Sequence, residues 1–198
     1  YVQINSLFGD PVDVTLAAWV NLTSADTDGS DVINIGNSVA LHLDSTVAGE
    51  LGVTAVFYDG SNWEATETNT YIAGTGWRHV AATFDDVNNE QKVYIDGILV
   101  ATSNHTGSIS YTRDAYTRVG THTSSGHEDN YEFTGMIDDA RIYSRALSAD
   151  EIAALSADQT SVTGNVSITV NPANTAPVAT NDAYSVDEDQ SLAVDQTT

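Results

Sequence analysis

Three carboxylates stand close together in one short stretch of the chain. Asp26, Asp28 and Asp31 surround Gly29 in the segment Asp26-Thr-Asp-Gly-Ser-Asp31, at spacings similar to those of calcium-binding loops. The bidentate Glu that closes an EF-hand loop is absent, so the segment is not an EF-hand. A solvated turn that uses Asp and Gly for their backbone freedom would also explain these residues. Both interpretations, a calcium site and an acidic turn, remain open.

A fourth carboxylate, Asp138, lies in a segment, residues 133–143, that alternates as a strand does. Counting every second residue places it on an apolar face with Met136, Ala140 and Ile142. An unpaired carboxylate is costly on such a face, so we expect Asp138 to be buried and satisfied. Calcium, an arginine or backbone N–H groups could satisfy it.

Aromatic and polar side chains in predicted loops could bind a sugar. Lectin-like sites stack an aromatic face on a pyranose ring and add carboxylate and amide hydrogen bonds, sometimes with calcium. Trp63 stands in a polar turn, where a core tryptophan is less expected. Packing at the rim of the domain is the alternative for each loop aromatic, since single exposed hydrophobic residues are ordinary. The candidate ligand-binding residues are Trp63, Tyr58, Tyr111, Tyr116, His122, His127, Asp129 and Asn130.

Short strands and one helix must position these residues. Strand-like alternation or apolar runs occupy 1–8, 15–22, 32–35, 39–43, 51–58, 78–85, 91–95, 98–102, 117–121 and 133–143, with turns roughly every eight to twelve residues. Near the end, Ser148 and Glu151 have the spacing of a capping box, and Leu147 and Ile152 that of a hydrophobic staple. The sequence therefore predicts an all-β, two-sheet antiparallel sandwich with one short C-terminal helix at about 148–156.

Four motifs carry a resemblance to a known family. They are Ala17-Ala-Trp-Val20, Gly76-Trp-Arg-His-Val-Ala-Ala-Thr-Phe-Asp85, Val93-Tyr-Ile-Asp-Gly97 and Phe133-Thr-Gly-Met-Ile-Asp-Asp-Ala-Arg-Ile-Tyr143. In order and spacing they resemble the laminin-G-like, concanavalin-A-like jelly-roll domains of secreted bacterial proteins. The resemblance implies a jelly roll over residues 1–157, a structural calcium near the strand of Asp138, and core positions for Trp19 and Trp77. The family binds many ligands, so it implies no particular one.

The composition changes after the predicted helix. Residues 158–176 read as a final strand and a Pro-containing linker. Residues 177–198 resemble the opening of the cadherin-like tandem repeats of large bacterial surface proteins, and they are too few for a domain of their own. The start of the chain is already strand-like and shows no signal peptide. We expect a fragment of a secreted, cell-surface protein with neighbouring domains in the same polypeptide.

The charge balance excludes several partners. The chain of 198 residues carries 28 acidic and 6 basic residues, a net charge of −22, and every basic residue lies between Arg78 and Arg145. Such a surface repels nucleic acids and anionic membranes. No apolar run reaches the length of about 18 residues that a membrane span requires. Cysteine is absent, so stability must come from a core and, as we expect, from calcium.

Catalysis has little support in the sequence. Glucanases of the resembling fold carry Glu-x-Asp-x-x-Glu on one strand, and this motif does not occur here. The pairs Asp85-Asp86 and Asp138-Asp139 are adjacent, so the two carboxylates of each pair face opposite ways on a strand. We predict a non-catalytic, calcium-dependent carbohydrate-binding or cell-adhesion module whose partner is a glycan or cell-surface ligand. The alternatives are a calcium-stabilised spacer without a ligand and an accessory domain of a polysaccharide-degrading enzyme.

Overall fold

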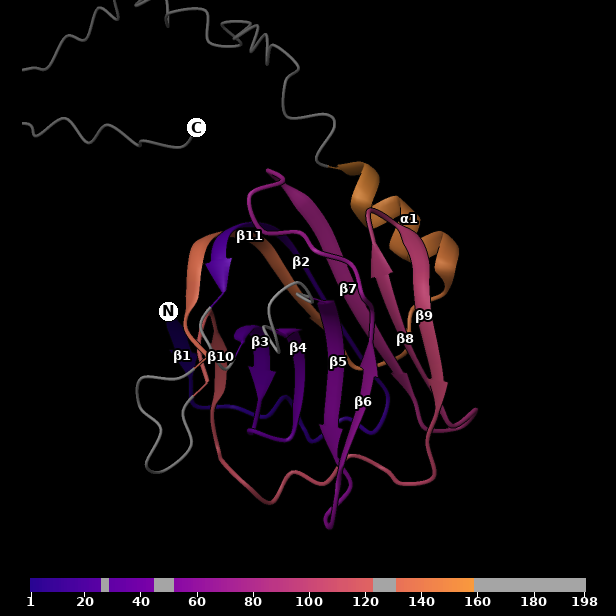
Figure 1. Cartoon of the computed structure of the whole chain (residues 1–198). Helices are drawn as coiled ribbons and strands as arrows, with labels where there is room; N and C mark the ends of the chain where they lie inside the picture. The colour runs from indigo at the N-terminus through magenta and orange to yellow at the C-terminus, as the bar shows by residue number, and fades with distance from the viewer. Residues whose placement is uncertain (26–28, 45–51, 123–130, 159–198) are drawn as a thin grey trace, which may run out of the picture. The chain divides into compact units, whose positions relative to one another are not determined.

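The computed structural model describes residues 1–25, 29–44, 52–122 and 131–158, and these form two antiparallel sheets with one helix (Figure 1). One sheet has the order β1-β10-β3-β4-β5-β6 and the other the order β11-β2-β7-β8-β9. The predicted all-β sandwich is confirmed. The elements are β1 (Val2–Ile4), β2 (Val14–Ala25), β3 (Ser30–Ile35), β4 (Val39–Asp44), β5 (Gly52–Tyr58), β6 (Trp63–Glu67), β7 (Arg78–Asp85), β8 (Glu90–Ile95), β9 (Ile98–Asn104), β10 (Thr117–Val119), β11 (Phe133–Tyr143) and α1 (Ala149–Ala157).

The core lies between the two sheets and follows the alternation of the sequence. In β2 every second residue is buried between the sheets, and these residues are Leu16, Ala18, Val20 and Leu22. Across the sandwich the ring of Phe57 meets that of Phe84 edge to face, with 6.0 Å between centroids. Burying one such side chain contributes about 1.5–3 kcal/mol, so the interlocked rows are what join the sheets.

Helix α1 packs on the outer face of the five-stranded sheet. Ser148 caps it as predicted, accepting a hydrogen bond from the Glu151 N–H while the Glu151 carboxylate accepts from the Ser148 N–H at 2.8 Å. Leu147 and Ile152 are both buried in a small cluster that includes Tyr94 of β8. The capping box and the two flanking apolar residues therefore fix where the helix starts and which face it buries. Within the described residues, no helix is long and apolar enough to span a membrane.

Strand β11 does not keep a strict alternation, and this corrects the expectation for Asp138. Asp138 pairs with Trp19 and Arg141 pairs with Ala17, so β11 carries one extra residue at a bulge. Before the bulge Ile137 packs against the core, and after it Ile142 does so as well. Asp138 is therefore exposed on the outer face of the five-stranded sheet, where solvent reaches its carboxylate.

Two further expectations from the sequence meet different outcomes. Trp77 was expected in the core, but it is 42 % exposed, and Trp19 is half-buried with its ring against His79 on the outer face of its sheet. The predicted final strand and linker (residues 158–176) and the predicted repeat (residues 177–198) lie outside the described residues, apart from Asp158.

Candidate functional site

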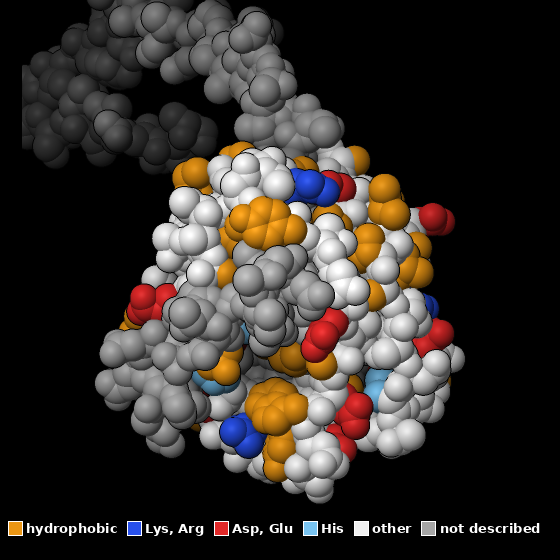
Figure 2. All heavy atoms as spheres, viewed as in Figure 1, with side chains coloured by type: hydrophobic (Ala, Val, Ile, Leu, Met, Phe, Trp, Pro, Cys, Tyr) orange, Lys and Arg blue, Asp and Glu red, His pale blue; other side chains and the backbone are white. Residues whose placement is uncertain are grey.

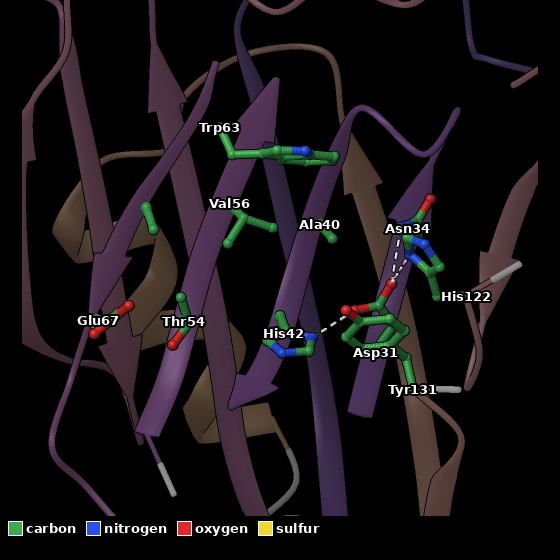
Figure 3. Close-up of a pocket in the computed structure, with 11 residues that line it drawn as sticks. Asp31, Asn34, Ala40, His42, Thr54, Val56, Trp63, Glu67, His122 and Tyr131 are labelled. Atoms are coloured by element: carbon green, nitrogen blue, oxygen red, sulfur yellow. Dashed lines mark hydrogen bonds and ion pairs between the residues drawn. The ribbon is translucent and has the colours of Figure 1, made fainter. Parts of the chain in front are cut away.

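A cavity of about 330 Å³ opens on the outer face of the six-stranded sheet (Figure 3). The residues of its floor point outward from the sheet, because the residues before and after them along each strand point into the core. Asn34, Ala40, Val56 and Ala65 form one row across β3, β4, β5 and β6, each paired with the next. Because two of the four are alanines, the middle of the sheet face is shallow enough to admit a ligand.

Trp63 forms the wall at one end of the cavity. Figure 3 shows its indole edge-on beside Val56 and Ala40, so that one face of the ring is turned toward the cavity. The side chain is 46 % exposed. Away from the cavity its ring contacts Tyr58, with 5.5 Å between centroids, and the guanidinium of Arg113 lies 5.1 Å from the indole centre. Arg113 also lies 4.8 Å from the Tyr58 ring, so one cation supports both aromatics.

The β5–β6 hairpin explains why these two aromatics meet. Tyr58 and Trp63 are direct cross-strand partners at its end. The turn between them is held by Asp59, whose Oδ1 accepts hydrogen bonds from the Ser61 and Asn62 N–H groups at 2.7 and 2.6 Å. The N–H groups of Asn62 and Ser61 lower the pKa of Asp59. The Asp59-Gly60 turn signal in the sequence thus closes the hairpin that presents Trp63.

A buried carboxylate organises the opposite wall. Asp31 Oδ1 lies 2.7 Å from His42 Nδ1, and its Oδ2 accepts a hydrogen bond from Asn34 Nδ2 at 2.8 Å and lies 3.1 Å from His122 Nδ1. Burial alone would raise the pKa of Asp31, but hydrogen bonds from His122 and His42 hold it at about 2, below its ordinary 3.8. Asp31 is therefore ionised at neutral pH and fixes the orientation of its partners.

Two more residues complete this wall. The ring of Tyr131 packs against His122, with 4.7 Å between centroids, and against His42 at 5.5 Å. Behind His42 the backbone of Gly29 lies so close to Nε2 that any Cβ there would overlap the ring, and Gly29 has a φ of +99° that glycine tolerates best. The Gly29 backbone thus packs close to one side of the His42 ring, while Nδ1 is taken by Asp31.

Thr54 and Glu67 line the remaining side. They continue a second row across the sheet, in which Asp31 pairs with His42, His42 with Thr54, and Thr54 with Glu67. Thr54 is 2 % exposed, and its Oγ1 has no hydrogen-bond partner among the described residues. A buried hydroxyl without a partner is unusual, and it points to a polar group that enters the cavity from outside.

The structure brings only part of the predicted site together. Asp31, Trp63 and His122 line the cavity and Tyr58 backs it. Tyr111 lies elsewhere: its hydroxyl donates to the Pro11 carbonyl at 2.8 Å, and burial raises its pKa.

The other predicted residues do not reach the cavity or are not described. Tyr116 packs beneath the guanidinium of Arg118, and Asp138 belongs to the other sheet. Asp26, Asp28, His127, Asp129 and Asn130 lie outside the described residues.

Several lining residues were missed from the sequence. These are Asn34, Ala40, His42, Thr54, Val56, Ala65, Glu67 and Tyr131. The first five occupy outward positions of strands that the sequence does predict, so the alternation itself was the signal that could have found them.

Of the four calcium candidates from the sequence, the structure describes Asp31 and Asp138. No three His, Asp or Glu side chains in the part of the chain that the structure describes are grouped to hold a metal ion. Asp31 uses both of its oxygens to accept from or contact nitrogen atoms of Asn34, His42 and His122, and Asp138 is exposed on the other sheet.

Comparisons with known proteins agree with this architecture. Residues 1–153 match the laminin G-type family model described as "Concanavalin A-like lectin/glucanases superfamily". No curated protein matches the chain.

Three solved structures illustrate the likeness. The CBM40 domain of the Ruminococcus gnavus IT-sialidase, bound to α2,3-sialyllactose, has a TM-score of 0.61 at 22% identity, covering 74% of this chain and 83% of that one. Domain 4 of an extracellular arabinanase from Geobacillus stearothermophilus, in complex with arabinotriose, gives 0.60 at 20% identity, covering 78% and 71%. A heptameric SAP-like pentraxin from Limulus polyphemus gives 0.58 at 15% identity, covering 74% and 70%. At these identities the likeness establishes the fold.

Proposed function

The chain belongs to the laminin G-type family of the concanavalin A-like lectin/glucanases superfamily, and from this premise we propose that it is a non-catalytic carbohydrate-binding module. The ligand is a glycan that enters the cavity on the six-stranded sheet. The observation that carries the proposal is the indole face of Trp63, which forms one wall of a cavity whose other walls are polar. Sugar rings are recognised by this combination, because their C–H face stacks on an aromatic ring while their hydroxyls hydrogen-bond.

The fold neighbours support a glycan ligand. The Ruminococcus gnavus domain is bound to sialyllactose and the Geobacillus stearothermophilus domain to arabinotriose. One ligand is acidic and the other is neutral, so the neighbours together support the class of ligand and leave its charge open.

The separation of the cavity carboxylates argues against glycoside hydrolysis. Such enzymes place two carboxyl groups about 5–9.5 Å apart across the scissile bond. Asp31 and Glu67 lie on β3 and β6, with β4 and β5 between them, which is about 14 Å at the usual strand spacing. Asp31, with its pKa lowered to about 2, is also unable to act as a general acid near neutral pH.

We further propose that glycan binding depends on calcium, that it serves cell adhesion and that the protein is extracellular. Asp26 and Asp28, the calcium candidates of the sequence, lie outside the described residues. The high negative charge and the absence of cysteine are compatible with calcium-assisted stability. A spacer domain without a ligand is the alternative that the experiment below must exclude.

Two exposed tryptophans allow a matched test. Trp63 and Trp77 are 46 % and 42 % exposed, but only Trp63 lines the cavity. We expect glycan-array binding, followed by titration calorimetry on each positive glycan, to show that Trp63→Ala weakens affinity at least about tenfold, or about 1.4 kcal/mol. Trp77→Ala should leave the affinity unchanged. If the wild-type protein binds no glycan on the array, with or without calcium, the proposal is rejected in favour of a spacer domain.

A further inference from the structure

We propose that the cavity selects uncharged sugars, whose hydroxyl groups are read by Glu67 and Thr54, and rejects sugars that carry a carboxylate. This inference rests on the proposed function and specifies the chemical class of its ligand. It follows from the charges that line the cavity, from where the cations of the domain lie, and from two polar side chains that have no partner among the described residues.

The charged groups in the cavity are carboxylates. Asp31 and Glu67 line it at opposite ends of one row, and no Lys or Arg is among its described lining residues. Asp31 is ionised and has both oxygens engaged by neighbouring side chains. Glu67 is exposed, and no hydrogen bond or ion pair joins its side chain to another described residue. A ligand therefore meets one carboxylate with free acceptor capacity and no opposing cation.

Five of the six Lys and Arg residues are already in ion pairs. Within the described residues, the pairs and their distances are Arg78–Asp96 at 2.7 Å, Lys92–Glu90 at 2.6 Å, Arg118–Asp114 at 2.5 Å, Arg141–Asp139 at 2.5 Å and Arg145–Glu151 at 2.6 Å. Arg113 is in no described ion pair, and its guanidinium rests on the rings of Tyr58 and Trp63. It does not line the cavity. A sugar carboxylate would thus find no Lys or Arg among the described residues that line the site.

Arg118 lies near the cavity, but its guanidinium is already engaged. It is paired with Asn34 across β10 and β3, which brings its backbone next to the cavity row. Its side chain is 4 % exposed, and it donates to Gln3 Oε1 at 3.0 Å and to Asp114 Oδ2. Recruiting this arginine for a ligand would require breaking a buried ion pair, which is costly.

Thr54 and Glu67 form a pair suited to hydroxyl groups. They are direct cross-strand neighbours that both line the cavity, with the Glu67 side chain exposed and the Thr54 hydroxyl buried beside it. The Thr54 hydroxyl can donate and accept, while an ionised Glu67 only accepts. Adjacent sugar hydroxyls can donate to the carboxylate and exchange a hydrogen bond with the threonine. A carboxylate at the same place could not donate to Glu67 and would be repelled by it.

The surface around the cavity adds to this selection. Acidic side chains are scattered over the face shown in Figure 2, and Lys and Arg side chains are sparse there. With a net charge of −22, the whole chain repels anions at low ionic strength and does so less as salt screens the charge. The long-range contribution is therefore salt-dependent, whereas the lack of a cationic partner in the cavity is not.

The test compares oligosaccharides that differ by a carboxylate. We would titrate the protein with galactotriose and trigalacturonic acid, with lactose and α2,3-sialyllactose, and with cellotriose and its uronic-acid counterpart, at low and at high salt. We expect the neutral member to bind at least about tenfold more tightly wherever a pair shows binding, with a smaller ratio at high salt. Equal or tighter binding of the carboxylated member overturns the inference but leaves the proposed function intact. Absence of binding by any neutral or acidic glycan on the array removes both.

Two variants separate the local role of the Glu67 side chain from the effect of the net charge of the protein. Glu67→Gln keeps the side-chain shape. We expect it to weaken the binding of the neutral glycan and to reduce the affinity ratio between the neutral glycan and its carboxylated counterpart. Glu64→Gln removes the same charge from the same strand, but Glu64 pairs with the core residue Phe57 and lies outside the cavity lining. The Glu64→Gln substitution should change neither the affinity for the neutral glycan nor the affinity ratio. Equal effects of the two substitutions would show that selection comes from net charge alone, which contradicts the assigned role of Glu67.

Thr54→Val provides a readout that a structural role would not give. Because the hydroxyl has no partner in the described protein, its removal should leave the melting temperature unchanged or raise it. If the hydroxyl binds the sugar, the same substitution should weaken the neutral glycan several-fold. Unchanged affinity for the neutral glycan together with unchanged stability would overturn the role of Thr54 in binding the sugar.

Discussion

Replacing Asp31 by Asn tests whether the buried carboxylate holds the polar wall together. In the native protein Asp31 receives Asn34 Nδ2 on one oxygen and His42 Nδ1 on the other, and it is 2 % exposed. An asparagine offers one acceptor oxygen and turns an N–H₂ group toward donors. At least one buried donor then loses its partner, so we expect the free energy of unfolding at pH 7 to fall by about 2–4 kcal/mol.

The pH dependence of stability gives an independent estimate for the same group. The pKa of Asp31 lies at about 2 in the folded protein against an ordinary 3.8. A carboxyl group with a lowered pKa stabilises the folded state above the unfolded value, and this contribution is lost as the pH falls through the folded value. The contribution is about 2 kcal/mol at neutral pH, and it disappears between about pH 4 and pH 2.

Urea denaturation of both proteins at constant ionic strength would measure these effects. The difference in unfolding free energy between wild type and Asp31→Asn should have its largest value, on the order of 2–4 kcal/mol, at pH 5–7. It should decrease by about 2 kcal/mol as the pH approaches 2.5. Asp138→Asn, an exposed site on the other sheet, is the matched control and should change stability little. A difference that stays constant from pH 7 to pH 2.5 would refute the argument that the ionised form of Asp31 is the stabilising one.

Further predictions concern β11, the helix and calcium. Asp139 has a φ of +51° and pairs through both oxygens with Arg141, so Asp139→Ala should cost about 1–2 kcal/mol and Asp138→Ala less than about 1 kcal/mol; equal urea midpoints would contradict the bulge. Ser148→Ala should cost about 1 kcal/mol through loss of the N-cap, while Ser156→Ala in the last turn of the helix should cost less; thermal melts of both variants would measure this. If the calcium expectation is right, excess chelator at matched ionic strength lowers the melting temperature, and an unchanged melt of metal-free protein would remove it.

The fold was predictable wherever one rule acted alone. Leu16 and Val20 alternate with outward residues and lie in the core, and Ser148 begins the helix because side-chain capping is a local interaction. The same alternation failed for Asp138, since a period of two cannot register an extra residue. The adjacent pair Asp138-Asp139 was nevertheless a usable signal, because Asp accepts a positive φ more readily than most residues.

The candidate site was only partly predictable because it depends on strand pairing. Trp63 and Asp31 were identified from their residue type and sequence surroundings. Thr54 was not, since its importance arises from standing between His42 and Glu67 in one row of the sheet. Nothing in the sequence near residue 54 indicates which residues lie across from it, so the order of the strands had to be known first.

The bulge in β11 also determines which changes of chain length the domain can tolerate. The strand places Ile137 and Ile142 in the core although they are five residues apart, because one residue is spare between Asp138 and Arg141. Deleting Ala140 would restore regular pairing with Ile142 still opposite Leu16, but it would place Asp139 opposite the core residue Ala18 and so turn a carboxylate toward the core. A single-residue deletion there should therefore be more harmful than a substitution at the same place. The bulge absorbs the extra residue, so that the last part of the strand and the helix after it keep the register with β2 that regular pairing would give them.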